Sequence, residues 1–162
     1  ETLRTEQELA AMQDRLPRAV RERAVLERPF ELRPVHPPED PIAPPPQEPQ
    51  RQVWLRTVAK LPDEPALHQC LLAYASDHSF ITTALLPHGV TWLTPGMQIA
   101  SLDHVMWFHR PLRMDQWLLY VIDSPSASGA RGLVRGRLFA QDGTLVASTA
   151  QEGLIRQRLP QP

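Results

Sequence analysis

The chain has 162 residues, of which 42% are hydrophobic, and its formal net charge is −1 at pH 7. This length and composition suit one domain with a substantial core. A near-neutral charge argues against bulk attraction to nucleic acid or to an anionic membrane surface, and no apolar run approaches the ~20 residues of a membrane-spanning helix. We therefore expect neither nucleic acid nor a membrane as a partner.

The only cysteine, Cys70, has no partner within the chain for a disulfide. A reducing compartment is therefore expected, and we predict a cytoplasmic protein. The sequence shows no signal peptide and no Ser-Lys-Leu peroxisomal address at its end. Because it starts at Glu1 rather than at a methionine, we expect it to be part of a longer chain. Nothing in it predicts a metal or a cofactor.

The first 27 residues have a helical pattern. Thr5 and Glu8 have the spacing of a capping box, and apolar residues follow at helical intervals. A short amphipathic helix is predicted over 5–16, and a weaker one over 17–26. We interpret residues 1–27 as a helical linker segment.

The main domain is predicted to span residues 28–160. It opens with a strand-like alternation over 30–35, and a proline-rich stretch follows at 34–49, where eight of sixteen residues are Pro. This composition predicts a surface loop with extended polyproline conformation. A ligand for an SH3-type domain is the alternative interpretation of the loop.

A strand over 52–58 is followed by a predicted amphipathic helix over 64–75. Asp63 is a suitable N-cap for this helix, and Pro65 is tolerated in its first turn. Apolar residues recur at i, i+3, i+4 and i+7, which predicts one buried stripe. Its members are Leu67, Cys70, Leu71 and Tyr74. Cys70 is accordingly interpreted as a buried spacer and not as a nucleophile.

The remainder is dominated by strand-like runs. A second helical segment is predicted at about 79–86, and strands are predicted at 98–109, 116–123, 130–140 and 144–156. Asp142 and Gly143 predict a hairpin turn between the last two strands. This order indicates an α+β fold in which one long helix packs on one face of a curved antiparallel sheet. The open edge of such a sheet is suited to pairing with a second unit.

Ser101, Asp103 and His104 suggest a hydrolase triad at first sight. On one strand, however, Ser101 and Asp103 share a face at ~6.6 Å along the strand, and His104 points to the other face. No nucleophile and base can hydrogen-bond within this segment. We therefore assign Asp103 and His104 to structure.

Two further polar positions are unusual. Asp77 lies between the two helical segments, where an N-cap role would also explain it. Gln151 shares its predicted strand face with Ala147 and Thr149, although an amide that bonds along the sheet is the simpler interpretation. His78, beside Asp77, is expected to be exposed.

The motifs ASDHSF, IASLDHVMWFHRP, SASGARGLVRG and DGTLVASTAQEGLIR closely resemble the carboxy-terminal half of the acyl-CoA thioesterase II family. The resemblance covers roughly residues 28–158. It implies a hotdog fold, in which a long helix is wrapped by an antiparallel sheet, and hydrolysis of acyl-CoA to free acid and coenzyme A. It also implies an amino-terminal hotdog half of the same protein as partner, and a homo-oligomer of double hotdogs.

The resemblance further implies a catalytic set of Asp77, Ser101 and Gln151 that holds one water. Arg131 and Arg135 share a strand face with Arg137 and are candidates for binding the CoA phosphates, with a solvated cationic face as the alternative. Two rival functions are considered. One is a non-catalytic hotdog half that serves dimerisation or supports a partner's site. The other is a related dehydratase, whose catalytic histidine the pair Asp77–His78 imitates weakly.

Overall fold

The computed structural model describes residues 3–11, 16–24, 28–78 and 80–158. Its helices are α1 (Glu6–Ala11), α2 (Arg18–Ala24), α3 (Pro65–Ser76) and the 3₁₀ helix η1 (Ile81–His88). Its strands are β1 (Phe30–Pro34), β2 (Gln50–Thr57), β3 (Met97–Ser101), β4 (Val105–Phe108), β5 (Leu118–Ser128), β6 (Arg131–Ala140) and β7 (Leu145–Gln157). These elements confirm the predicted α+β class.

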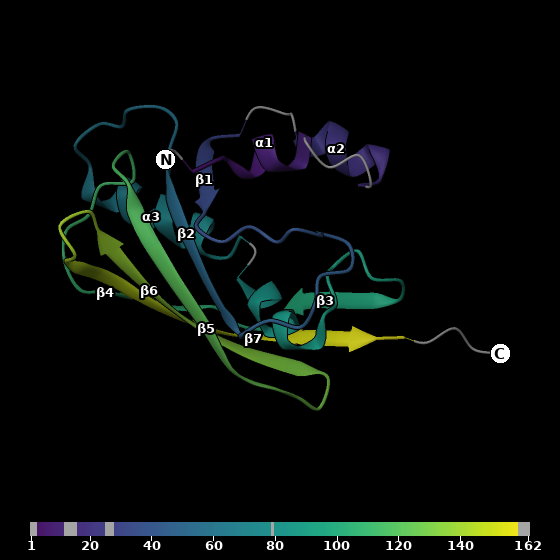
Figure 1. Cartoon of the computed structure of the whole chain (residues 1–162). Coiled ribbons are helices and arrows are strands. Elements are labelled where there is room, and N and C mark those ends of the chain that lie inside the picture. The colour runs from purple at the N-terminus through teal and green to yellow at the C-terminus, as the bar shows by residue number, and fades with distance from the viewer. Residues whose placement is uncertain (1–2, 12–15, 25–27, 79, 159–162) are drawn as a thin grey trace.

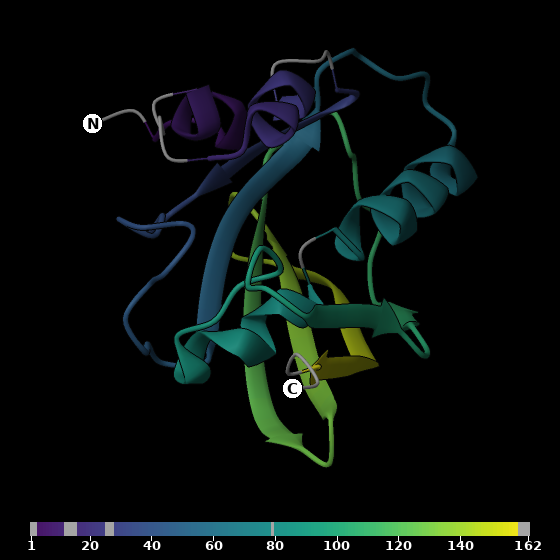
Figure 2. The ribbon, with the colours of Figure 1, turned by 90° about the vertical axis from the view of Figure 1, so that its right-hand side faces the viewer.

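Within the described residues, the seven strands form one antiparallel sheet in the order β1-β2-β5-β6-β7-β3, and β4 also pairs with β7. The sheet is strongly curved, with α3 at one end and η1 across its lower part (Figures 1 and 2). Side chains from both helices enter one hydrophobic core with those of the sheet. Its members include Leu72, Ala75, Ile81, Ala84, Tyr120, Ile122 and Val134.

Two glycines bring η1 close to the sheet. A Cβ at Gly132 in β6 would lie 2.6 Å from the Cβ of Ala84, and one at Gly153 in β7 would lie 2.5 Å from Cγ1 of Ile81. Contacts this short exclude a larger side chain unless η1 moves. The strand backbones thus hold η1 in place, and with it the connection from the end of α3.

The bounds of α3 agree with the predicted helix to within one residue. The predicted stripe is wrong for Cys70 and Tyr74, whereas Leu67 and Leu71 are half-buried. The residues of α3 that are buried are His68, Leu72, Ala75 and Ser76, whereas Tyr74 is 74% exposed and Cys70 is exposed. Apolar spacing alone missed this face because two of its members are polar residues with internal partners. Nδ1 of His68, for example, accepts a hydrogen bond from the backbone N–H of Met114 at 3.1 Å.

The predicted N-cap of α3 is also wrong. Glu64 occupies the N-cap position and makes no side-chain capping bond. Asp63 instead accepts a hydrogen bond from Nη1 of Arg113 at 2.9 Å. A charged partner elsewhere in the fold thus engages this carboxylate, which leaves the first turn of α3 without the predicted cap.

The strand predicted over 98–109 is two strands, β3 and β4. The register runs from Ser101 opposite Gly153 to Val105 opposite Ala150, so that three residues of one strand face two of β7. The N–H groups of Leu102 and Asp103 both point to the carbonyl of Glu152, at 3.0 and 3.4 Å. This bulge breaks the strict alternation that the sequence interpretation assumed.

The other predicted strands are confirmed with shifts of one or two residues at their ends, except that β5 extends five residues beyond the predicted end at 123. The turn at Asp142 and Gly143 is also confirmed, since Gly143 has a φ of 85° and Asp142 Oδ1 accepts a hydrogen bond from Thr144 N–H at 2.9 Å. The proline-rich stretch contains no helix or strand after Pro34.

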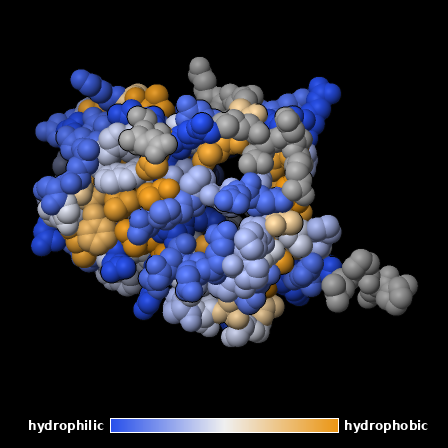
Figure 3. All heavy atoms as spheres, viewed as in Figure 1, coloured by the Kyte–Doolittle hydropathy of each residue, from blue (hydrophilic) through white to orange (hydrophobic). Residues whose placement is uncertain are grey.

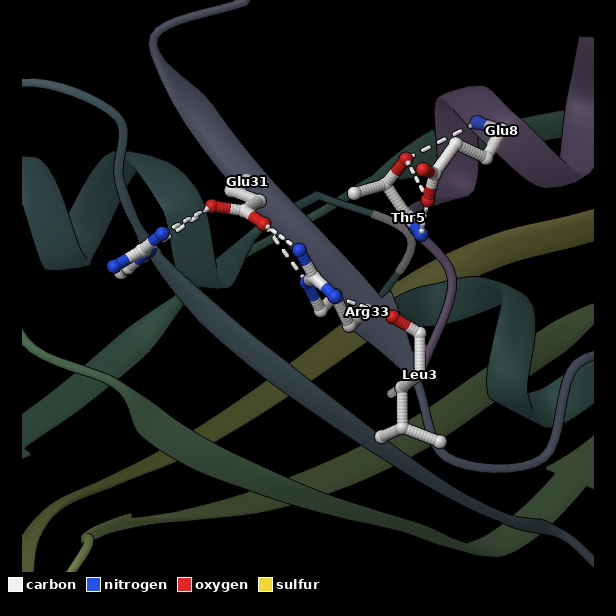
Figure 4. A network of polar contacts seen from close by, with 6 residues as sticks. Leu3, Thr5, Glu8, Glu31 and Arg33 are labelled. Atoms are coloured by element: carbon white, nitrogen blue, oxygen red, sulfur yellow. Dashed lines mark hydrogen bonds and ion pairs between the residues drawn. The ribbon is translucent and has the colours of Figure 1, made fainter. Parts of the chain in front are cut away.

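The capping box at the start of α1 is confirmed. Glu8 N–H donates to Thr5 Oγ1 at 3.1 Å, and Thr5 N–H donates to Glu8 Oε2 at 2.6 Å. Arg33 of β1 donates to the Leu3 carbonyl and pairs with Glu31, which ties the segment to the sheet (Figure 4). Residues 12–15, 25–27 and 159–162 lie outside the described part. The structure therefore does not describe four predicted boundaries, namely the helix ends at 16 and 26, the linker boundary at 27 and the domain end at 160.

Candidate functional site

Asp77 directly follows the last turn of α3. Its backbone keeps a right-handed conformation, with φ −76° and ψ −21°, and forms the C-cap of the helix. The N-cap of η1 is Phe80, which has no side-chain capping bond. The carboxylate of Asp77 therefore does not cap the following helix, and it points elsewhere.

The carboxylate meets two side chains from the sheet. Gln151 of β7 donates from Nε2 to Oδ1 of Asp77 at 2.5 Å, and Ser101 at the end of β3 donates from Oγ to the same oxygen at 3.3 Å. The second bond is long for a pair of oxygens. Three residues that lie far apart in the chain thus converge on one carboxylate oxygen.

Solvent reaches the three groups unequally. Asp77 and Ser101 are exposed, whereas Gln151 is only 1% exposed. Oε1 of Gln151 is buried and has no hydrogen-bond partner among the described residues. An unsatisfied buried acceptor costs about 1–3 kcal/mol, so this amide is costly for the fold unless it serves another purpose.

The segment around Ser101 contains no relay of its own, as predicted. Ser101 turns to Asp77, while Oδ1 of Asp103 accepts a hydrogen bond from Glu152 N–H at 2.7 Å. Nε2 of His104 lies 2.9 Å from Oγ of Ser76. The three polar residues of this motif therefore serve three different connections.

Chemically, the site combines a proton acceptor, the Asp77 carboxylate, with two hydrogen-bonding groups that orient it. Both hydrogen bonds go to Oδ1 of Asp77, and Oδ2 takes part in neither. A carboxylate held in this way is suited to accept a proton from a water molecule at its exposed side. The Ser101 hydroxyl both donates and accepts, so it is able to orient that water.

The two arginines proposed for phosphate binding lie on the other face of the sheet. Arg131 and Arg135 are exposed in β6, whose inward residues include Val134, the register partner of Gln151. Arg131 lies 3.6 Å from Glu152, and Arg135 pairs with Asp123 at 2.6 Å. The structure thus does not bring them into the cluster around Asp77.

A cavity in the described part is separate from this cluster. It has a volume of about 370 Å³ and lies between α1, α2, the proline-rich loop and η1, below the N-terminal helices in Figure 3. His78, which is exposed and 3.3 Å from Glu6, lines it, but Asp77, Ser101 and Gln151 do not. Within the described residues, no group of three or more His, Cys, Asp and Glu side chains is placed to hold a metal ion.

Sequence reasoning missed Tyr120, whose hydroxyl lies directly behind the site. It donates to the Ser76 carbonyl at 3.2 Å and lies 2.8 Å from Oγ1 of Thr149. Burial raises the pKa of Tyr120 strongly, and the negative charge of Asp77 raises it further. A tyrosine on a buried strand gives no signal in the sequence, because only the fold shows what its hydroxyl meets.

A family model described as acyl-CoA thioesterase matches residues 20–154. The chain belongs to the acyl-CoA thioesterase family. Acyl-CoA thioesterase 2 of Haemophilus influenzae is 43% identical over 141 residues, which are 87% of this chain and 49% of that protein. Human acyl-coenzyme A thioesterase 8 is 44% identical over 147 residues, which are 90% of this chain and 45% of that protein.

The chain thus spans about half the length of the curated relatives that it matches. Among solved structures, an acyl-CoA thioesterase II of Mycobacterium marinum is 45% identical with a TM-score of 0.67, over 90% of this chain and 53% of that one. A hotdog-fold protein of Alicyclobacillus acidocaldarius is 16% identical with a TM-score of 0.60, over 97% of this chain and 52% of that one, and shows the fold alone. The hotdog fold that the motifs implied is confirmed. None of the described helices is long and apolar enough to cross a bilayer.

Proposed function

We propose that this chain hydrolyses acyl-CoA thioesters to the free acid and coenzyme A. The convergence of Asp77, Ser101 and Gln151 on one oxygen carries the proposal, because each comes from a different element and the cluster is partly open to solvent. Relatives named acyl-CoA thioesterases support the substrate class.

Asp77, Ser101 and Gln151 have different roles around one water molecule. The water oxygen forms a bond to the thioester carbonyl carbon while one of its protons passes to the Asp77 carboxylate. The carbon–sulfur bond then breaks, and the CoA thiolate takes that proton as it leaves. Ser101 and Gln151 fix the carboxylate and the water in the orientation for attack, and such positioning contributes several kcal/mol to catalysis.

We further propose that a second hotdog unit completes this site. Apolar side chains are exposed along the β4 edge beside Ser101, namely Leu102, Val105, Trp107 and Phe108, at 56%, 44%, 51% and 39%. Figure 3 shows hydrophobic atoms gathered near β4 and β6. Since the chain spans half of its relatives, we assign this edge to the amino-terminal hotdog half of the longer protein, which in turn assembles into a homo-oligomer.

The domain limits, the phosphate contacts and the compartment remain proposals of the same kind. Residues 1–27 are assigned as a helical linker and 28–160 as the hotdog thioesterase domain. Arg131 and Arg135 are assigned to CoA phosphates, in competition with Glu152 and Asp123. The unpaired, exposed Cys70 supports a reducing compartment, and we place the protein in the cytoplasm.

A non-catalytic hotdog half, which supports the site of a partner, is the alternative. It offers no reason for a buried amide that lies beside a carboxylate and whose Oε1 has no partner among the residues that the structure describes. Release of free thiol from acyl-CoAs of increasing chain length tests the proposal, both for this chain alone and for the chain joined to an amino-terminal hotdog half. Turnover that depends on Asp77 supports catalysis by this half. Turnover of the joined protein that is unchanged by Asp77→Asn establishes the alternative.

A further inference from the structure

A buried polar network lies directly behind the proposed site. Tyr120 of β5 is 2% exposed, and its hydroxyl donates to the carbonyl of Ser76 at 3.2 Å. Oγ1 of Thr149 lies 2.8 Å from the same hydroxyl. Since the tyrosine proton is used on the carbonyl, the threonine hydroxyl is the donor in the second contact.

Each residue of the site is a near neighbour in the chain of one member of this network. Ser76 directly precedes Asp77, and Thr149 precedes Gln151 by two residues on the same buried face of β7. His104 follows Ser101 after the bulge, and its Nε2 lies 2.9 Å from Oγ of Ser76. The network therefore joins the same three chain segments whose side chains meet at the Asp77 carboxylate.

The sheet leaves room for this network at one glycine. A Cβ at Gly136 in β6 would lie 2.3 Å from Cε2 of Tyr120 and 2.4 Å from Oγ1 of Thr149. Any larger residue at position 136 displaces the tyrosine ring or the threonine hydroxyl. Gly136 thus leaves room for Tyr120, whose hydroxyl holds the end of α3, and for Thr149, which contacts the same hydroxyl.

We infer that Tyr120 is a positioning residue that fixes Asp77 for attack on the thioester. The inference rests on the proposed function of Asp77. The Tyr120 hydroxyl holds the last carbonyl of α3, and the carboxylate projects from the next residue. A shift of the helix end by a fraction of an ångström moves Asp77 relative to Gln151 and Ser101, and misplacement by about 1 Å costs on the order of a hundredfold in rate.

Burial keeps the Tyr120 hydroxyl in one protonation state. Because burial raises the pKa of Tyr120 well above its usual range, the group stays protonated and donates at every pH at which the enzyme works. The Tyr120 hydroxyl therefore adds no titration of its own to the pH dependence of the reaction, and its effect is geometric.

Tyr120→Phe removes the hydroxyl and keeps the ring, and Tyr74→Phe is the matched control because Tyr74 is 74% exposed. In this chain or in the joined protein, whichever turns over acyl-CoA, Tyr120→Phe should lower kcat by about tenfold or more and change KM by less than about twofold. The control should match wild type. Thr149→Val should act like Tyr120→Phe, whereas Thr149→Ser, which keeps a hydroxyl, should restore most of kcat.

A double variant separates positioning from general loss of stability. In an Asp77→Asn background, Tyr120→Phe should lower kcat little further, because the group that it positions is gone. Full multiplication of the two losses would overturn the inference. A kcat within twofold of wild type in both Tyr120→Phe and Thr149→Val would overturn it as well.

The side-chain amide signals of Gln151 in an NMR spectrum give a readout that needs no activity. If Tyr120→Phe and Gly136→Ala both shift these signals while Tyr74→Phe does not, the positioning of the cluster is supported even where turnover is absent in the wild type. Shifted Gln151 signals in a protein without turnover would count against the proposed function and not against the positioning role of Tyr120. Unchanged Gln151 signals in both network variants would count against the positioning role itself.

Discussion

Gln151 in β7 donates a hydrogen bond of 2.5 Å to Asp77 at the end of α3, across 74 residues of the chain. The bond joins a nearly inaccessible amide to an exposed carboxylate. It therefore fixes Oδ1 of Asp77 from the inside of the domain, whereas Oδ2 takes part in neither of the two hydrogen bonds. This arrangement suits a general base, because the carboxylate is held through one oxygen while the residue is exposed.

Asp77→Asn should lower kcat by about a hundredfold or more, because the amide keeps the shape but accepts protons poorly. Ser101→Ala should have a smaller effect, since its bond to Oδ1 is long at 3.3 Å. Steady-state thiol release measures both. Asp63→Asn is the control, since its side chain is 94% exposed and it is paired with Arg113 away from the site. Wild-type kcat in Asp77→Asn would remove this residue from the mechanism.

Gln151→Met should separate activity from stability. Methionine has a similar length and fills the buried volume, but it orients neither the carboxylate nor a water. The variant loses one hydrogen bond and also removes a buried oxygen that has no partner within the described part of the chain. The free energy of unfolding should therefore stay within about 1 kcal/mol of wild type or rise. Its kcat should fall by more than tenfold. Urea unfolding and thiol release check the two expectations, and full activity together with a clear loss of stability would contradict both.

The sequence pattern predicted the α+β class, the limits of α3 and the turn at Gly143, because these depend on local spacing and backbone preference. It failed where tertiary partners override spacing. The buried face of α3 includes His68, whose Nδ1 accepts a hydrogen bond from the Met114 backbone, and the bulge after Ser101 depends on the register with β7. The three site residues were assigned through a family resemblance, because no local pattern predicts that segments 74 residues apart will meet.

Cys70→Ser should leave the kinetics unchanged, because the residue is exposed and lies off the buried face of α3. In the folded wild type, the thiol should react with an aromatic disulfide reagent as fast as a small thiol within about an order of magnitude. A thiol that reacts only after unfolding would contradict the exposed position. The variant also removes the background reaction from thiol-release assays.

Asp115 should make the stability of the domain depend on acid pH. Hydrogen bonds from the Arg113 guanidinium and from Leu61 N–H hold the pKa of this carboxyl well below its usual range. The unfolded chain binds a proton at a pH near 3.9, whereas the folded one does so only at a lower pH. The contribution of the charged carboxylate is therefore fully present above about pH 5 and is lost as the pH falls through the folded pKa.

Asp115→Asn removes this contribution. Wild type should be more stable than the variant at pH 7, and the difference should shrink steadily between about pH 5 and pH 2. Urea unfolding at several pH values measures it, with Asp63→Asn as the control on the other side of Arg113. A difference that stays constant down to pH 2 would be inconsistent with the lowered pKa. Because the bond to Leu61 holds the loop that enters α3, the weakened variant should also loosen the element that carries Asp77.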